Sequence, residues 1–310
     1  MSDTSPGTAS GVRDSLITTE TREVSPGVRS VGLRTHPLRF DNLSSANVLP
    51  RTAEEFLIAS RNVRHDRETQ LSVAHYFSDP VTIALAQASK KPGDGSERIA
   101  LPEAQPPAAD LADAIATRRS ARQFARGPLS LEQVATLLRY GNSETAEVLA
   151  PLDGGGEAVL RLRTAPSAGG LYPVELWVAA LDVTGLARGV YRYLPHEDAL
   201  ELWAGADTLQ PLLDSCVDLG PGGLTASGSA VLLFVGSPWR SMRKYGPRGM
   251  RFLLHETGAI SQNVHLTATA LEVGSLDYSG YFDDETHRAL GVDGVFRAVV
   301  HLVLLGAVAQ

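Results

Sequence analysis

The chain has 310 residues, of which 43% are hydrophobic and 20% are charged, and its 28 basic and 35 acidic residues give a net charge of −7. This length allows one large domain or two smaller ones, and the acidic balance argues against a broadly nucleic-acid-binding surface. Because Cys216 is the one cysteine, an internal disulfide and a zinc site built on cysteine pairs are excluded. No apolar run reaches the roughly 18–20 residues of a membrane span, and the polar N-terminus lacks the apolar core of a secretory signal, so we expect a cytoplasmic protein.

The first third of the chain is predicted to carry little of the fold. Residues 1–50 are rich in Ser, Thr, Gly, Pro and Arg, a composition typical of a flexible arm. A helical N-terminal extension is expected over 51–109, and its last part, 91–109, contains several prolines and is interpreted as a linker. The domain after it is expected to span 110–310. Within the extension, helices are expected at 54–61 and 81–90.

Helix signals become stronger after the linker. Asp110 is placed to cap a helix that runs to about Arg118. Ser130 and Gln133 have the spacing of a capping box, and Gly141 is the expected end of the helix that follows. The apolar positions on one face of that helix are Leu131, Val134, Leu137 and Leu138.

Strands and helices alternate irregularly in the rest of the domain. Short apolar or β-favouring runs predict strands at 176–181, 189–193, 230–236 and 296–305. A long helical pattern covers 249–272. Because these elements show no regular βαβ alternation, the sequence predicts an α+β fold.

A cluster of three arginines is the first candidate for chemistry. Arg118, Arg119, Ser120 and Arg122 lie within five residues at the expected end of a short helix. Guanidinium groups form bidentate, charge-assisted hydrogen bonds with phosphate, so the cluster suits a phosphate monoester. A solvated basic helix end, favoured by the helix dipole, explains the same residues.

Three further short motifs can carry function. The sequence at 166–173 is Pro-Ser-Ala-Gly-Gly-Leu-Tyr-Pro, and its glycines and small residues let the backbone approach a flat ligand. Lys244 and Tyr245 can transfer protons if burial or a nearby charge shifts their pKa values. Ser279 and Gly280 can turn a backbone N–H toward a ligand. Each motif taken singly also has a simpler explanation. The first can be an ordinary loop, the second a surface lysine next to a half-buried tyrosine, and the third a turn.

Four features, taken in chain order, resemble the nitroreductase-like flavoprotein superfamily. They are the arginine cluster, the 166–173 loop, the Lys-Tyr pair and a helix carrying Gln262-Asn263. The loop and the Lys-Tyr pair are similar in particular to its SagB-type branch, the azoline dehydrogenases of ribosomal peptide natural-product pathways. The resemblance covers roughly residues 110–306. It implies a central mixed β-sheet flanked by helices, in a domain-interlocked homodimer that binds FMN at its interface.

The resemblance also implies roles for individual residues. The FMN phosphate and ribityl chain are expected to contact Arg118, Arg119, Ser120 and Arg122. The flavin ring is expected to lie beside Pro166, Ser167, Ala168 and Gly169, from the other subunit, and to face the backbone of Ser279 and Gly280, with Gln262 on a helix nearby. Lys244 and Tyr245 are the implied catalytic pair, and either of them can be the base. No metal is expected, because no histidine spacing suits one.

The implied reaction is the oxidation of thiazoline or oxazoline rings to thiazoles or oxazoles in a precursor peptide, with dioxygen reoxidising the flavin. The peptide and the cyclodehydratase of the same pathway are then the expected partners. Two alternatives stay open. One is an NAD(P)H-dependent nitroreductase, and the other is a non-catalytic scaffold homologue in a cyclodehydratase complex.

Overall fold

The structure, a computed structural model, describes residues 52–62, 67–78, 97–103, 106–151, 155–217, 219 and 228–308. The chain divides into two units, residues 1–64 and 65–310. In the first unit, α2 (Thr52–Ala59) coincides with the helix expected at 54–61. The arm expected over 1–50 and the helix expected over 81–90 lie outside the described residues.

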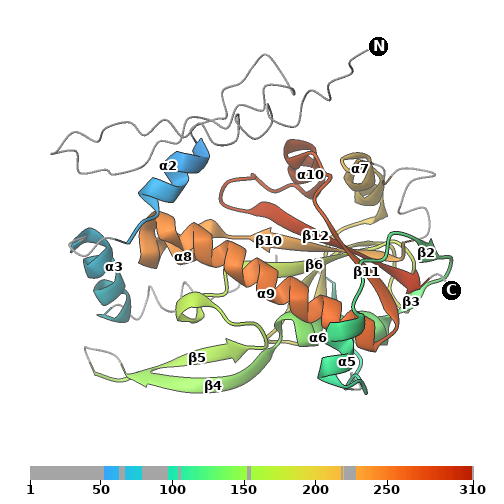
Figure 1. The fold of residues 1–310 in the computed structure, drawn as a ribbon, viewed down its shortest axis with the longest axis horizontal. Helices are drawn as coiled ribbons and strands as arrows, with labels where there is room; N and C mark the ends of the chain where they lie inside the picture. Colours follow the sequence, from blue (N-terminus) through green and yellow to red (C-terminus); the bar gives the residue numbers. More distant parts are fainter. Residues whose placement is uncertain are drawn as a thin grey trace, which may run out of the picture. The chain divides into compact units, whose positions relative to one another are not determined.

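An eight-stranded sheet forms the centre of the second unit (Figure 1). Its strands, in spatial order, are β1 (Arg98–Ala100), β9 (Ala199–Ala204), β8 (Gly189–Leu194), β6 (Val174–Ala180), β10 (Ala230–Gly236), β12 (Ala298–Val308) and β11 (Val273–Tyr278), and β2 (Phe124–Ala125) pairs with the end of β12. Each described pairing in this sheet is antiparallel, which differs from the expected mixed sheet. The parallel pairing of β3 (Leu129–Ser130) with β7 (Val183–Thr184) lies outside it.

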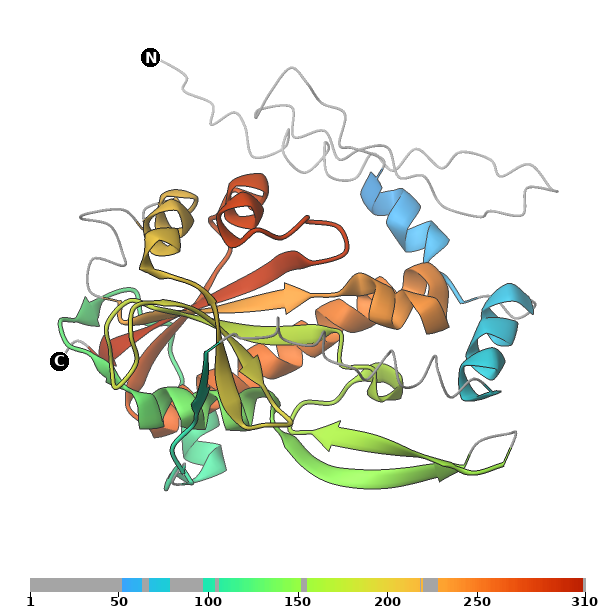
Figure 2. The same cartoon turned by 180° about the vertical axis from the view of Figure 1, so that it is seen from behind.

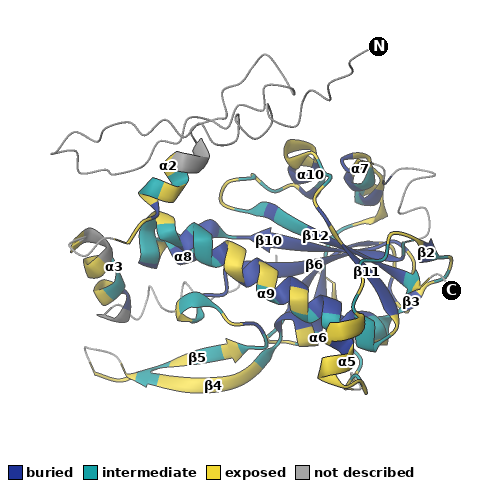
Figure 3. Ribbon diagram, in the orientation of Figure 1, coloured by how far each residue is buried: buried dark blue, intermediate teal, exposed yellow. Residues whose placement is uncertain are grey.

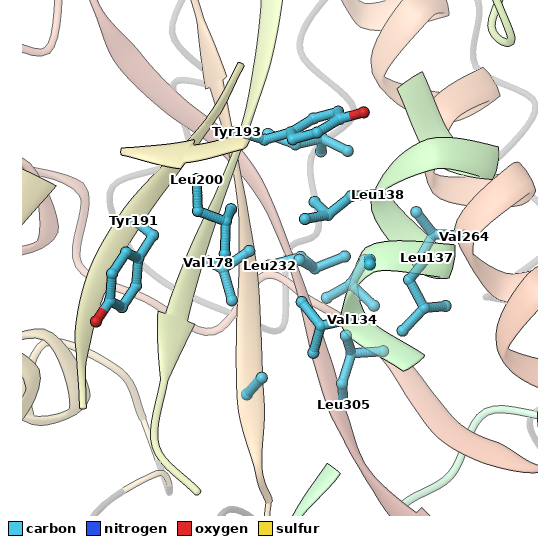
Figure 4. Close-up of a cluster of buried hydrophobic side chains, with 14 of the residues drawn as sticks. Val134, Leu137, Leu138, Val178, Tyr191, Tyr193, Leu200, Leu232, Val264 and Leu305 are labelled. Atoms are coloured by element: carbon cyan, nitrogen blue, oxygen red, sulfur yellow. The ribbon is translucent and has the colours of Figure 1, made fainter. Parts of the chain in front are cut away.

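Helices cover both faces of this sheet (Figures 1 and 2). One face packs against α6 (Leu131–Asn142) and α9 (Gly249–Ala270), and the other packs against α7 (Leu209–Asp214) and α10 (Asp283–Leu290). Because successive side chains of a strand point to opposite faces, Leu176 and Val178 join the first core and Trp177 and Ala179 the second. Figure 4 shows the first core, in which side chains of α6 and α9 meet those of the strands.

The predicted helix starts in this unit are confirmed. The Asp110 side chain accepts from two N–H groups at the start of α5 (Leu111–Thr117), and Ser130 and Gln133 form the capping box of α6. Gly141 does not end α6, which continues to Asn142. The side of α6 that carries Gly141 packs closely on α9, where a Cβ atom at this position would lie 3.0 Å from Val264. Gly141 is therefore a packing position.

The stretch expected as a linker, 91–109, contains β1. Arg98, Ile99 and Ala100 pair with β9, so this part of the stretch belongs to the edge of the sheet. The sequence pattern misses it because the strand has three residues and two of them are exposed. Within the described ranges, no helix combines the length and apolar character that crossing a membrane requires.

Three smaller elements lie beside the start of α9. They are α8 (Pro238–Tyr245), α3 (Arg67–Ser78) and the hairpin of β4 (Glu144–Pro151) and β5 (Glu157–Arg163). The 166–173 loop leads from this hairpin into β6. Figure 3 shows α9 as a helix with one buried and one exposed side, whereas most of β4 is exposed. The functional motifs lie at the two ends of α9.

The junction of α8 and α9 gives a test of this packing. A Cβ atom at Gly249 would lie 2.6 Å from the backbone nitrogen of Met242, so Gly249→Ala must push the two helices apart. We expect it to lower the free energy of unfolding by about 1–3 kcal/mol in urea titrations. Gly258→Ala on the same helix is the control. Its Cβ would meet nothing within 4 Å, so it should raise stability by about 0.5–1 kcal/mol. Equal stability of the two variants would contradict the packing described.

Candidate functional site

The 166–173 loop and the Lys244-Tyr245 pair are far apart in the sequence but meet in the structure. Lys244 and Tyr245 form the last turn of α8, and the loop contains the short helix η1 (Ala168–Gly170). A Cβ atom at Gly169 would lie 2.6 Å from Oη of Tyr245 and 2.9 Å from Nζ of Lys244. Both side chains therefore reach the space that this glycine leaves open.

The backbone of the loop is left-handed at three positions. Gly169, Gly170 and Tyr172 have φ angles of 66°, 63° and 45°. Glycine adopts such angles readily, whereas a tyrosine keeps one only when its surroundings hold it there. The loop conformation thus depends on contacts with the rest of the fold.

Tyr172 is held at each of its polar groups. Its N–H donates to Oγ of Ser167 at 2.9 Å. Its carbonyl accepts a hydrogen bond from Nη1 of Arg240 at 3.0 Å, and its hydroxyl accepts one from the backbone N–H of Arg163 at 2.9 Å. The Arg163 guanidinium also lies 4.6 Å from the centre of the Tyr172 ring. These contacts tie the loop to α8 and to β5.

Lys244 is almost fully enclosed, with 2% of its surface exposed. Its Nζ lies 4.1 Å from the centre of the Tyr76 ring in α3 and 5.3 Å from that of Tyr245. Ser72 of the same helix donates to the carbonyl of Arg243 at 2.8 Å. Helix α3 therefore covers the Lys244 side chain, a contact that the sequence did not predict.

Burial shifts the pKa values of this group in opposite directions. It lowers the pKa of Lys244 from 10.5 to about 8, and it raises the pKa of Tyr245 and brings that of Tyr76 to about 12. The common cause is desolvation, which disfavours the charged form of any side chain. A neutral amine can accept a proton and a neutral phenol can donate one, so the pair has both functions once the pH exceeds the pKa of Lys244, about 8.

The sequence reasoning missed a buried carboxyl group beside the loop. Glu256 of α9 is 2% exposed, and its Oε1 accepts a hydrogen bond from the N–H of Val174 at 3.1 Å. Burial raises the pKa of Glu256 to about 7. The groups that oppose this effect are the Ser167 hydroxyl, the Val174 N–H and the guanidinium groups of Arg163 and Arg240. A signal existed in the sequence, because Glu256 falls on the apolar helix face of Leu253 and Ile260.

The arginine cluster lies beside β11, which is the last strand in the spatial order of the sheet. The N–H of Ala121 donates to the carbonyl of Ser275 at 2.9 Å, which fixes the segment along this strand. Arg122 is exposed, and Nη1 of Arg119 donates to the carbonyls of Ala116 and Arg118 at 3.0 and 2.7 Å. In the described part of the chain, no carboxylate forms an ion pair with the three arginines of the cluster.

The remaining predicted residues lie between these two groups or beside them. Ser279 and Gly280 directly follow β11, the strand that anchors the arginine cluster. The carbonyl of Gly280 accepts from the N–H of Val217 at 2.6 Å and from the Tyr278 hydroxyl at 2.8 Å. Gln262 is exposed on α9. Among the described residues, no group of three or more His, Cys, Asp or Glu side chains is arranged to hold a metal ion.

The arginine cluster and the Lys244-Tyr245 pair do not meet within one chain. The Tyr245 ring packs on Phe252, in the first turn of α9, with ring centres 4.9 Å apart. The strand residue that anchors the cluster, Ser275, bonds to His265, thirteen residues further along the same helix. At 1.5 Å per residue, the two levels are about 20 Å apart along the axis. Figure 1 shows α8 and α5 at opposite ends of α9.

Comparisons with known proteins identify the family of the domain. The family model described as the nitroreductase family matches residues 115–306. The "Putative nitroreductase MJ1384" of Methanocaldococcus jannaschii is 30% identical over 187 residues, which cover 59% of this chain and 84% of that protein. The microcin B17-processing protein McbC of Escherichia coli is 30% identical over 146 residues, which cover 46% of this chain and 52% of that protein.

A solved structure shows the same fold over a longer range. It is the Escherichia coli microcin synthetase McbBCD complex with truncated pro-MccB17 bound. One of its chains matches with a TM-score of 0.52 and 22% identity, covering 86% of this chain and 100% of that chain. The expected α+β, nitroreductase-like fold is thereby confirmed. Since the family model matches more than half of its residues, the chain belongs to the nitroreductase family.

Proposed function

We propose that the protein is an FMN-dependent dehydrogenase that oxidises thiazoline or oxazoline rings in a ribosomally made peptide. The observation that carries the proposal is the pair formed by the buried Lys244 and the half-buried Tyr245, which packs on Gly169. A reductase that only passes electrons from flavin to a small oxidant needs no such proton-transfer pair. The similarity to McbC, named as a microcin B17-processing protein, supports a peptide substrate.

The residues around β11 fit FMN. A phosphate monoester needs cationic, multidentate donors, and the guanidinium groups of Arg118 and Arg122 with the Ser120 hydroxyl supply them without a competing carboxylate in the described residues. Arg119 adds a further guanidinium, part of which is bonded to backbone carbonyls. Ser279 and Gly280 directly follow this strand, and we expect their backbone to face the ring. Gln262 is exposed on α9, and we expect it to lie near the flavin.

The chain's own residues then provide the proton chemistry. Bound FMN supplies the two-electron acceptor that takes the hydride from the ring, and dioxygen regenerates it. The azoline Cα–H is acidic because it lies between a carbonyl group and a C=N bond, so a base of moderate strength can remove it. Burial lowers the pKa of Lys244 and raises that of Tyr245, which supports the amine as the base and the phenol as a proton donor.

The separation of the two groups along α9 supports a homodimer with shared sites. A flavin held by the arginine cluster of one chain meets the loop and the Lys244-Tyr245 pair of a second chain. The same reasoning places Pro166, Ser167, Ala168 and Gly169 beside the ring from that second chain. Each active site thus needs both subunits. The cyclodehydratase that makes the azoline is the further partner, as the McbBCD complex suggests by analogy.

A nitroreductase that uses NAD(P)H is the second candidate, and family membership favours it. Purified protein incubated with NADH and a nitroaromatic compound tests it directly. Fast nitro reduction without oxidation of an azoline peptide would replace the first proposal by this one.

Lys244→Ala tests the base. We expect the variant to keep bound FMN, seen in its absorption spectrum, and to lose about 10²–10⁴-fold in turnover, the usual contribution of a general base. Turnover is followed by mass spectrometry as the loss of two hydrogens per ring. The wild-type rate should rise with pH up to about 8, because the neutral amine is the active form, and this rise should vanish in the variant. Wild-type rates in a flavin-loaded Lys244→Ala protein would exclude Lys244 as the base.

Mixing of variants tests the shared site. The first variant carries Arg118→Ala and Arg122→Ala, and the second carries Lys244→Ala, so each should be inactive alone. After subunit exchange at equal amounts, half of the dimers are mixed and each has one intact site, which restores about a quarter of the wild-type activity. If the cluster and the pair acted within one chain, mixing would restore nothing. A mixture of wild-type and variant protein, exchanged in parallel under the same conditions, controls for the efficiency of subunit exchange.

A further inference from the structure

The strained loop at the candidate active site has one anchor on α9. Val174, the first residue of β6, directly follows the loop, and its N–H donates to Oε1 of Glu256. Its carbonyl accepts from Nδ2 of Asn142 at 3.2 Å. Both peptide groups at the end of the loop are therefore held by side chains of the two helices that cover this face of the sheet.

Glu256 also faces the other residues that hold the loop. The Ser167 hydroxyl accepts a hydrogen bond from the Tyr172 N–H, and its hydrogen bond with the Glu256 carboxyl group lowers the pKa of that group. The positive charges of Arg163 and Arg240 lower the same pKa. Arg240 lies four residues before Lys244, so the two side chains are neighbours on one face of α8. The carboxyl group thus connects the loop, β5, α8 and α9 where they surround Lys244.

We propose that Glu256 is a positioning residue of the candidate active site, which fixes the Ser167–Val174 segment and thereby holds Gly169 against Lys244 and Tyr245. A buried carboxyl group costs free energy unless its environment compensates for it. Here the Val174 N–H donates to Oε1, and the charges of Arg163 and Arg240, which also hold Tyr172, act on the group. Without it, the segment loses its bond to α9, and Gly169 moves away from the amine. Water then reaches Nζ of Lys244.

The composition of the chain makes this measurable at a single residue. The three lysines are Lys90, Lys91 and Lys244. A short pulse of acetic anhydride at a series of pH values, followed by mass spectrometry of the peptides, gives the labelling midpoint of Lys244 in the full-length protein. Lys90 and Lys91 report the activity of the reagent in the same sample. The readout needs neither bound flavin nor turnover.

In the wild-type protein the midpoint of Lys244 should lie near pH 8. Glu256→Ala should move it upward toward 10.5, the ordinary value of a solvated lysine. Glu256→Gln keeps an acceptor for the Val174 N–H and should restore most of the wild-type midpoint. Should Glu256→Ala fail to fold, Glu256→Asp decides, since its shorter side chain does not reach Val174 and should shift the midpoint in the same direction.

Glu201→Ala is the matched control. Glu201 is an equally buried acid on β9, paired with Arg192 at 2.9 Å. Because Arg192 lines the same pocket as Arg163 and Arg240, Glu201→Ala disturbs these arginines but leaves the bond between Glu256 and Val174 in place. The proposal is wrong if folded Glu256→Ala or Glu256→Asp protein keeps the wild-type midpoint, or if Glu201→Ala shifts it equally. The functional importance of Glu256 rests on the proposed function, but the labelling does not. A shifted midpoint together with no azoline oxidation would leave the positioning intact and reject the dehydrogenase.

Discussion

The candidate site depends on one close contact, in which the backbone of Gly169 lies against Nζ of Lys244 and Oη of Tyr245. Gly169 has no Cβ, and its left-handed φ angle is one that other residues rarely adopt. Only because this space is free can Nζ of Lys244 and Oη of Tyr245 converge on the loop. The residues around it serve to keep that contact: Tyr172 is bound on three sides, and Tyr76 covers the amine from α3.

Enclosure decides what these side chains can do chemically. A lysine and a tyrosine in water are a cation and a neutral phenol, and neither is an effective base at neutral pH. Removing water lowers the pKa of the amine to about 8 and raises that of the phenol, so that both are mostly uncharged above about pH 8 and below the raised pKa of the phenol. One fold thereby obtains a proton acceptor and a proton donor from adjacent residues. Because α3 and the 166–173 loop surround the Lys244 amine, a substrate has to enter this enclosed space to reach it.

The long helix α9 divides the functional residues into two groups. Its first turn carries the contacts of Tyr245 and its second half adjoins the strand that anchors the arginine cluster. The residues proposed for flavin binding and for proton transfer therefore lie near opposite ends of one rigid element. This division explains why a single chain carries these motifs without bringing them together, and it is the reason why the proposed function calls for a second copy.

The sequence by itself determined the α+β class, the caps and starts of α5 and α6, most central strands, and the residue types at the site, because these depend on local spacing and on the turn chemistry of a few residues. It did not reveal β1 or the role of Gly141, which depend on pairing and packing with distant segments. It missed the buried Glu256 and the cover that Tyr76 gives to Lys244. These features depend on which surfaces meet, and only the tertiary structure decides how much water remains around a given side chain.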